Sequence, residues 1–64
     1  MDIETLINYA KEYVHEDMHN YYDWGTIASN IDYIEDLDCY EIPSIDWIFY
    51  INENGELLQA NYNY

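Results

Sequence analysis

Residues 15–19 form a stretch of this sequence whose residue types and spacing match a catalytic signature. The string HEDMH fits the H-E-x-x-H pattern of zinc peptidases. On an α-helix, His15 and His19 lie one turn apart on the same face, where two imidazoles can hold one Zn²⁺ while Glu16 activates a bound water. A small zinc peptidase-like protein is therefore one hypothesis for the function of this chain.

The rest of the chain gives the zinc hypothesis little support. A catalytic zinc site needs three protein ligands, and the candidates for the third, Glu35 and Glu41, lie in an acidic stretch outside any ligand motif. Cys39 is the only cysteine, with no Cys, His and Asp arrangement to make it a nucleophile, and we expect it to be a small residue that is either buried or at a sheet edge. We therefore expect no catalytic residues, no metal site and no cofactor.

Two amphipathic helices are predicted in the first two thirds of the chain. Apolar residues recur at helical spacing from Asp2 to about Met18, with Asp2 as the N-cap, so that HEDMH falls in the last turn. A second apolar period predicts a helix over about 26–37, with Thr26 as a capping residue. Pro43 then marks a break, because it lacks an amide proton.

The last third of the sequence predicts an antiparallel β-hairpin. Two β-rich runs flank Asn54-Gly55, the pair best suited to a two-residue type I′ turn. That turn sets three cross-strand pairs that share one apolar face: Ile51 with Leu58, Phe49 with Ala60, and Trp47 with Tyr62. The predicted fold is α+β, a single domain over 1–64 with two helices packed on a C-terminal antiparallel hairpin. A short extra strand around 39–42 could join the hairpin edge.

Charge is the outstanding feature of the composition. Fourteen Asp and Glu residues face one basic residue, Lys11, so the formal net charge is −13. Half of the residues are nonetheless hydrophobic, and we expect a folded chain rather than a disordered one. Carboxylates without basic neighbours repel one another, which suggests that the counter-charge is on a partner. A halophilic host or a surface that only confers solubility is the other explanation.

Acidic residues and tyrosines together suggest a surface for a basic partner. On the predicted helices, carboxylates three or four residues apart approach the spacing of DNA phosphates. Nine tyrosines exceed what so small a core can use, and six are expected to resist continuous burial: Tyr21, Tyr22, Tyr33, Tyr40, Tyr62 and Tyr64. The candidate partner-binding residues are Asp32, Glu35, Asp36, Asp38, Glu41, Glu12, Glu16, Asp17, Asp23 and Tyr40.

In size, in charge and in the acidic series from Asp32 to Glu41, the chain resembles the small acidic DNA-mimic proteins of phages and mobile elements. That class includes anti-CRISPR and antirestriction proteins and inhibitors of uracil-DNA glycosylase, and its members share no fold. The resemblance implies an inhibitor that occupies the nucleic-acid-binding site of a host defence protein and blocks it sterically, without catalysis. An immunity protein or antitoxin that neutralises a basic toxin is the alternative.

Several further expectations concern partners and location. Direct binding of nucleic acid is not expected, because an anionic surface repels phosphates. The N-terminus has no basic segment followed by an apolar run, and no stretch is long enough to span a bilayer. We therefore expect no membrane association and a location in the host cytoplasm. Apolar residues on the second hairpin face, Ile48, Tyr50 and Leu57, are compatible with a homodimer.

Overall fold

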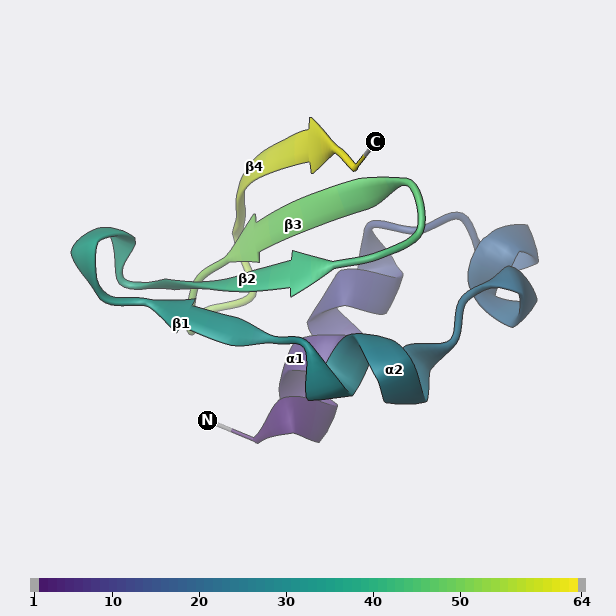
Figure 1. The fold of residues 1–64 in the computed structure, drawn as a ribbon, viewed down its shortest axis with the longest axis horizontal. Coiled ribbons are helices and arrows are strands. Elements are labelled where there is room, and N and C mark those ends of the chain that lie inside the picture. Colours follow the sequence, from purple (N-terminus) through teal and green to yellow (C-terminus); the bar gives the residue numbers. More distant parts are fainter. Residues whose placement is uncertain (1, 64) are drawn as a thin grey trace.

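The computed structural model describes residues 2–63 and has an α+β architecture (Figure 1). In chain order the elements are α1 (Ile3–Glu12), the 3₁₀-helix η1 (Glu16–Tyr21), α2 (Trp24–Ser29), β1 (Asp32–Ile34), the 3₁₀-helix η2 (Glu35–Leu37), β2 (Cys39–Pro43), β3 (Trp47–Ile51) and β4 (Leu57–Tyr62). The predicted fold class is confirmed. The C-terminal hairpin, however, belongs to a four-stranded antiparallel sheet in the order β1-β2-β3-β4.

Helix α1 ends at Glu12, so its predicted extension to Met18 is wrong. The N–H groups of Tyr13 and Val14 donate to the carbonyls three residues back, at 3.0 and 3.2 Å, which tightens the last turn. In addition, the His19 Nε2 atom lies 2.9 Å from the Lys11 carbonyl oxygen, an acceptor that a further helical turn would have used. Asp2 is the N-cap as predicted, although it acts through its backbone carbonyl and not through its side chain.

Helix α2 ends at Ser29, so the predicted helix over 26–37 is also wrong in extent. Its N-cap is Asp23, whose carboxylate accepts from the Thr26 N–H at 3.1 Å; Thr26 is therefore inside the helix and is not the cap. At the other end, the Ser29 hydroxyl and the Asn30 side-chain amide both donate to the Thr26 carbonyl oxygen. Such side-chain donors compete with the backbone and favour helix termination.

The remainder of the predicted second helix forms a strand and a tight turn. Residues of β1 pair antiparallel with β2, with Tyr33 opposite Tyr40. Asp38 closes the turn in the left-handed region at φ 50°, a conformation that Asp tolerates better than most residues. The helical spacing of the isoleucines was misleading, because isoleucine and tyrosine also suit a half-buried strand once a partner strand is available.

The pairing of β3 with β4 confirms two of the three predicted cross-strand pairs. Trp47 lies opposite Tyr62 and Phe49 opposite Ala60, but Ile51 pairs with Leu57 and not with Leu58 because of a bulge. The turn is longer than two residues, since the Asn52 side-chain oxygen accepts from the N–H groups of Asn54 and Glu56, both at 3.0 Å. The predicted extra strand is confirmed as β2, which pairs with β3 and is itself flanked by β1.

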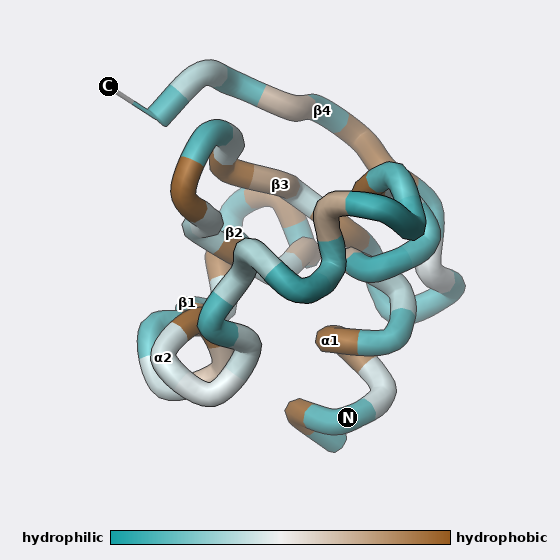
Figure 2. Tube along the Cα trace, turned by 90° about the vertical axis from the view of Figure 1, so that its right-hand side faces the viewer, coloured by the Kyte–Doolittle hydropathy of each residue, from teal (hydrophilic) through white to brown (hydrophobic). Residues whose placement is uncertain are grey.

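The core lies between the helices and one face of the sheet. In Figure 1, α1 lies behind the strands, and the side view of Figure 2 shows both α-helices below β3 and β4. The buried cluster draws on every layer and contains Leu6, Ile7, Ala10, Val14, Tyr22, Ile27, Ile42, Phe49 and Ile51. Among residues 2–63, no helix combines the length and the apolar character needed to cross a bilayer.

The tyrosines divide between core and surface. Tyr21, Tyr33 and Tyr62 are exposed as predicted, and Tyr40 is half-buried. Tyr22 is buried, contrary to prediction, because its ring packs against Trp24 with centroids 5.2 Å apart at the edge of the core. Tyr64 is outside the described residues.

Tyr9 of α1 and Tyr13, the C-cap that follows it, hold the β3–β4 turn against the helix. The Tyr13 hydroxyl donates to the Gly55 carbonyl oxygen at 2.7 Å and accepts from the Leu57 N–H at 3.1 Å. Gly55 has φ +83°, and a Cβ atom there would stand 2.8 Å from the Tyr9 ring. This turn therefore requires glycine both for its backbone conformation and for the close approach of Tyr9.

Replacing Gly55 with alanine is expected to lower the free energy of unfolding by about 1–3 kcal/mol, because it combines a left-handed backbone with a clash. Urea denaturation followed by circular dichroism measures this loss. Gly25→Ala is the matched control: its Cβ would meet only the Asp23 Oδ1 at 3.5 Å, inside a helix. The control should be neutral or stabilising by up to about 1 kcal/mol. Equal losses in the two variants would contradict this account of the turn.

Candidate anionic interface

The predicted partner-binding residues separate into two groups at opposite ends of the molecule. The hairpin-end group lies on β1, η2, β2 and the turn between them, and contains Asp32, Glu35, Asp36, Asp38, Glu41 and Tyr40. The helical-end group lies on the end of α1, on η1 and at the start of α2, and contains Glu12, Glu16, Asp17 and Asp23. Figure 1 places the β1–β2 turn at the left and η1 at the right of a longest dimension of 32 Å. The two groups therefore do not form one continuous acidic line.

The helical spacing proposed for these carboxylates is not present. Asp32 is on a strand, whereas Glu35 and Asp36 are on a 3₁₀ turn, because the helix predicted over 26–37 ends at Ser29. Glu12 and Glu16 do not lie one turn apart either, since α1 ends at Glu12. What concentrates charge at the hairpin end is the tight β1–β2 turn, where exposed acidic residues follow one another within a few positions.

Asp38 and Tyr33 fix the geometry of the hairpin end. The Tyr33 hydroxyl donates to the Asp38 Oδ1 at 2.7 Å, across the turn that Asp38 closes. The negative acceptor disfavours ionisation of the phenol and raises the pKa of Tyr33 to about 12. The Tyr33 ring also packs against Tyr40, with centroids 5.2 Å apart, so Tyr40 supports the ring that is half exposed beside the acidic turn.

Glu41 has a similar phenol partner on the neighbouring strand. It lies directly opposite Tyr50, whose hydroxyl donates to the Glu41 Oε2 at 2.9 Å and whose pKa is raised by this hydrogen bond. Glu41 is therefore half-buried and held in place, unlike the exposed carboxylates of the turn. Cys39 is buried, one of its two expected environments, and this burial raises the pKa of the thiol, which keeps it protonated at neutral pH.

The structure adds residues from the β3–β4 turn to the hairpin end. A shallow cleft of about 260 Å³ is lined by Asp38 and Leu37 on one side and by Asn52, Glu53, Asn54 and Leu58 on the other. Glu53 lies near enough to Tyr33 to help raise the pKa of that phenol. Sequence reasoning missed Glu53, because only the antiparallel order of the four strands brings the two turns to the same end. The acidic residues that flank Asn54-Gly55 were the feature of the sequence that could have indicated a second acidic turn.

The helical-end group includes a carboxylate with a structural task. Asp23 accepts from the N–H of Thr26 and, at 2.8 Å, from its hydroxyl, and these bonds lower the pKa of Asp23. Glu12, Glu16 and Asp17 are exposed. Asp23 is exposed as well, but its carboxylate caps the start of α2, and the other three carboxylates have no such role in a helix cap.

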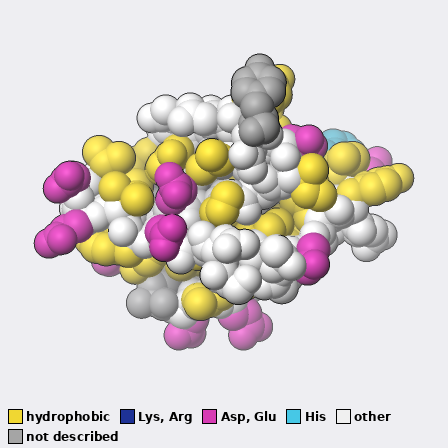
Figure 3. All heavy atoms as spheres, in the orientation of Figure 1, with side chains coloured by type: hydrophobic (Ala, Val, Ile, Leu, Met, Phe, Trp, Pro, Cys, Tyr) yellow, Lys and Arg dark blue, Asp and Glu magenta, His cyan; other side chains and the backbone are white. Residues whose placement is uncertain are grey.

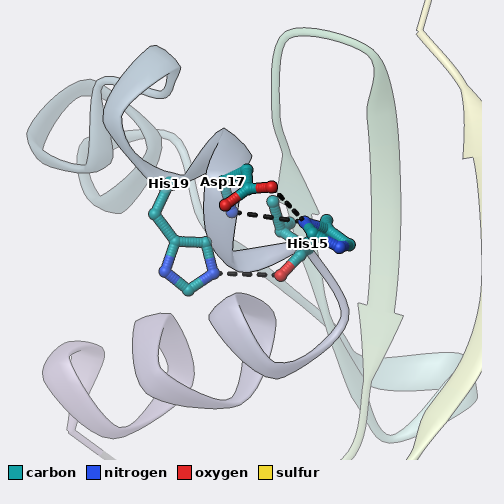
Figure 4. Close-up of polar contacts among 4 residues, drawn as sticks. His15, Asp17 and His19 are labelled. Carbon is teal, nitrogen blue, oxygen red and sulfur yellow. Dashed lines mark hydrogen bonds and ion pairs between the residues drawn. The ribbon is translucent and has the colours of Figure 1, made fainter.

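The HEDMH segment does not have the geometry of the zinc signature. His15 is the N-cap of η1, and its Nδ1 accepts from the Asp17 N–H at 3.2 Å and lies 3.6 Å from the Asp17 Oδ2. The His19 Nε2 instead donates to the carbonyls of Lys11 and Val14, at 2.9 and 3.0 Å. Figure 4 shows the two rings apart, each with its own partner. Across residues 2–63, no three His, Cys, Asp or Glu side chains are grouped so as to hold a metal ion.

Basic charge is remote from the hairpin end. Lys11 is the only Lys or Arg in the chain, and its Nζ lies 5.4 Å from the Trp24 ring centroid, on the helical side of the molecule. Figure 3 shows acidic and apolar side chains interspersed on the face it displays, without any Lys or Arg. At the hairpin end, Asp38 and Glu41 have hydroxyl donors from tyrosines, and within residues 2–63 no Lys or Arg side chain neighbours the carboxylates of that end.

Comparison of the chain with models of protein families, with curated proteins and with solved structures found no match.

The Tyr33 hydrogen bond predicts a late phenol ionisation. Because the pKa of Tyr33 is raised from 10.0 to about 12, the bond stabilises the fold fully below pH 10 and is lost as the pH rises through 12. In an absorbance titration of phenolate, Tyr33→Phe should remove an ionisation near pH 12, and Asp38→Asn should move it to lower pH. Tyr21→Phe, at the helical end, is the control and should leave that step in place. An unchanged high-pH step in Tyr33→Phe would contradict the assignment.

Proposed function

We propose that this protein is a DNA-mimic inhibitor that binds the nucleic-acid-binding site of a host defence protein, of the anti-CRISPR or antirestriction kind, and blocks it sterically. The observation that carries the proposal is the hairpin end, where exposed carboxylates of the β1–β2 turn and Glu53 of the β3–β4 turn gather without a basic side chain. The protein acts as a binder, without a catalytic step of its own.

Electrostatics supports a nucleic-acid-binding target over other basic proteins. Proteins that bind DNA present Lys and Arg side chains spaced to neutralise a regular series of phosphates. A rigid turn with several carboxylates offers the same sign of charge in a similar space. Because like-charged carboxylates destabilise the compact chain that carries them, contact with such a basic site relieves a repulsion that the protein cannot relieve internally.

Exposed apolar and aromatic side chains at the same end supply contact area. Leu37 is 60% exposed and Tyr33 50% exposed, and both lie on the β1–β2 turn or beside it. Interfaces commonly combine charge, which steers encounter, with aromatic anchors, which hold the complex together. The hydrogen bond to Asp38 and the packing on Tyr40 already fix the Tyr33 ring, so little conformational entropy is lost on binding.

The proposed place of action is the host cytoplasm, where defence proteins meet invading nucleic acid. A single buried cysteine, which forms no disulfide within the chain, is compatible with a reducing compartment.

The experiment that tests the function is competitive elution. Immobilised protein is incubated with nuclease-treated host lysate, and bound proteins are eluted with duplex DNA, with polyglutamate of equal charge, or with NaCl of equal ionic strength. Duplex DNA is expected to release a nucleic-acid-binding protein well before the two controls do. A captured protein that still binds DNA while attached would favour the immunity-protein alternative, and release by all three eluents alike would contradict mimicry.

Neutralising charge at the hairpin end should slow association with the captured target. The variant Asp32→Asn, Glu35→Gln, Asp36→Asn and Asp38→Asn keeps the αL turn, because Asn also tolerates φ above zero. We expect its association rate to fall by about tenfold or more and to depend less on salt. The matched control neutralises Glu12, Glu16, Asp17 and Asp46, all exposed and at the opposite end. Stopped-flow kinetics at two salt concentrations measures the association rate and its salt dependence for the two variants. Equal effects would show that net charge alone matters.

A further inference from the structure

Strand β4 is an open sheet edge of unusual composition for this chain. The strand order leaves β1 and β4 at the two edges. β1 has only three residues, begins with Asp32 and leads into an acidic turn, so it is protected by shortness and charge. β4 has six residues, Leu57–Tyr62, without a charged residue or a proline, and Glu56 is the last acidic residue of the sequence. In a chain so rich in acidic residues, β4 is therefore an edge strand without the charged side chains that commonly protect such edges.

The backbone of β4 presents hydrogen-bonding groups to this open side. The Asn63 N–H donates to the Asp46 carbonyl oxygen at 3.0 Å, in the same register that pairs Trp47 with Tyr62 and Phe49 with Ala60. In an antiparallel ladder, inward and outward residues alternate. The backbone N–H and C=O groups of Gln59 and Asn61 therefore face β3, and those of Ala60 face outward. Sheet edges of this kind are templates for another strand.

The side chains around Ala60 are suited to pairing with the same strand. In an antiparallel pair with Ala60 opposite its own copy, the two small side chains allow close approach, and each Gln59 stands opposite the other copy's Asn61. Leu58, which the bulge leaves 52% exposed, stands beside the other copy's Tyr62. A two-fold interface is self-complementary in this way, because each copy supplies both halves of every contact.

The distribution of charge favours a second copy of this chain over a basic peptide segment as the strand that pairs with β4. A cationic partner is attracted to the hairpin end, where the carboxylates are, and finds no countercharge on β4. Pairing through β4 joins two four-stranded sheets and leaves both β1 edges, with their acidic turns, at the outer ends of the combined sheet. Repulsion remains between Glu56 of one copy and the Asp46 region of the other, and salt screens such repulsion over about 8 Å at physiological ionic strength.

We propose that this protein forms a two-fold symmetric homodimer by antiparallel pairing of β4 with β4 of a second copy, centred on Ala60. The dimer does not depend on the proposed function. Both β1–β2 turns stay accessible in it, whereas Leu58, which lines the hairpin-end cleft, lies at the dimer interface. Its salt dependence has the opposite sign to that of a complex with a basic partner: the dimer strengthens as salt is added, whereas the complex weakens.

Sedimentation equilibrium over a range of protein and NaCl concentrations tests the dimer. The parent protein should associate to a dimer whose dissociation constant falls with added salt. Gln59→Glu with Asn61→Glu places like charges across the interface and should raise the dissociation constant by at least about tenfold. The matched control, Asn8→Glu with Asn20→Glu, adds the same charge at exposed positions away from β4 and should have a much smaller effect.

Charge rescue and amide exchange make the test independent of any one variant. A Gln59→Lys, Asn61→Lys variant mixed with the Glu variant should form a heterodimer more readily than either forms a homodimer. In the parent protein, the Ala60 amide should become protected from hydrogen exchange as protein concentration rises. A monomer at millimolar concentration in moderate salt would overturn the proposal, as would a dimer insensitive to the β4 charges. Protection of Ala60 only when a lysine-rich peptide is added to a monomer would also overturn it, and would assign the edge to a basic segment.

Discussion

The apolar layer between α1 and strands β2 and β3 is the interaction on which the rest of this structure depends. Ile42 and Ile51 are completely buried, Phe49 nearly so, and they pack in one cluster with Leu6 and Ala10. Burying each large side chain contributes about 1.5–3 kcal/mol. With fourteen acidic residues and one lysine, ion pairs cannot contribute comparably, and charge repulsion opposes compaction. The carboxylates are therefore confined to turns, helix ends and the open sides of strands.

Tyrosine hydroxyls take the donor role that basic side chains fill in most proteins. Tyr33 donates to Asp38, Tyr50 to Glu41, and Tyr13 to the Gly55 carbonyl, each within 2.9 Å. Hydrogen bonds to an ionised acceptor are shorter and stronger than neutral ones, so these phenols position carboxylates without removing their negative charge. Two of the nine tyrosines, Tyr33 and Tyr50, act on carboxylates in this way, and they hold Asp38 and Glu41 in fixed positions on an anionic surface.

The surface is divided between two kinds of contact. The hairpin end presents carboxylates with an exposed leucine and an exposed tyrosine, which is suited to a basic partner. Strand β4 presents uncharged side chains and an open ladder edge, which is suited to a second copy. Because the strand order is β1-β2-β3-β4, the acidic β1 edge and the uncharged β4 edge are on opposite sides of the sheet. Of the residues that line the hairpin-end cleft, only Leu58 belongs to β4.

Local chemistry in the sequence was sufficient for the fold class, the apolar face of α1, the presence of β2 and β3, and two cross-strand pairs. These features follow from alternation and periodicity over a few neighbouring residues. Tertiary contacts decided the rest. The His19 ring forms a hydrogen bond to the Lys11 carbonyl at the end of α1, an acceptor that a longer helix would have used. Pairing with β2 makes a strand of Asp32–Ile34, although the sequence there has helical spacing. The Asn52 side chain lengthened the β3–β4 turn and moved the partner of Ile51 to Leu57. Glu53 reached the hairpin end because antiparallel strands bring alternate turns together, a relation between distant segments that no local pattern contains.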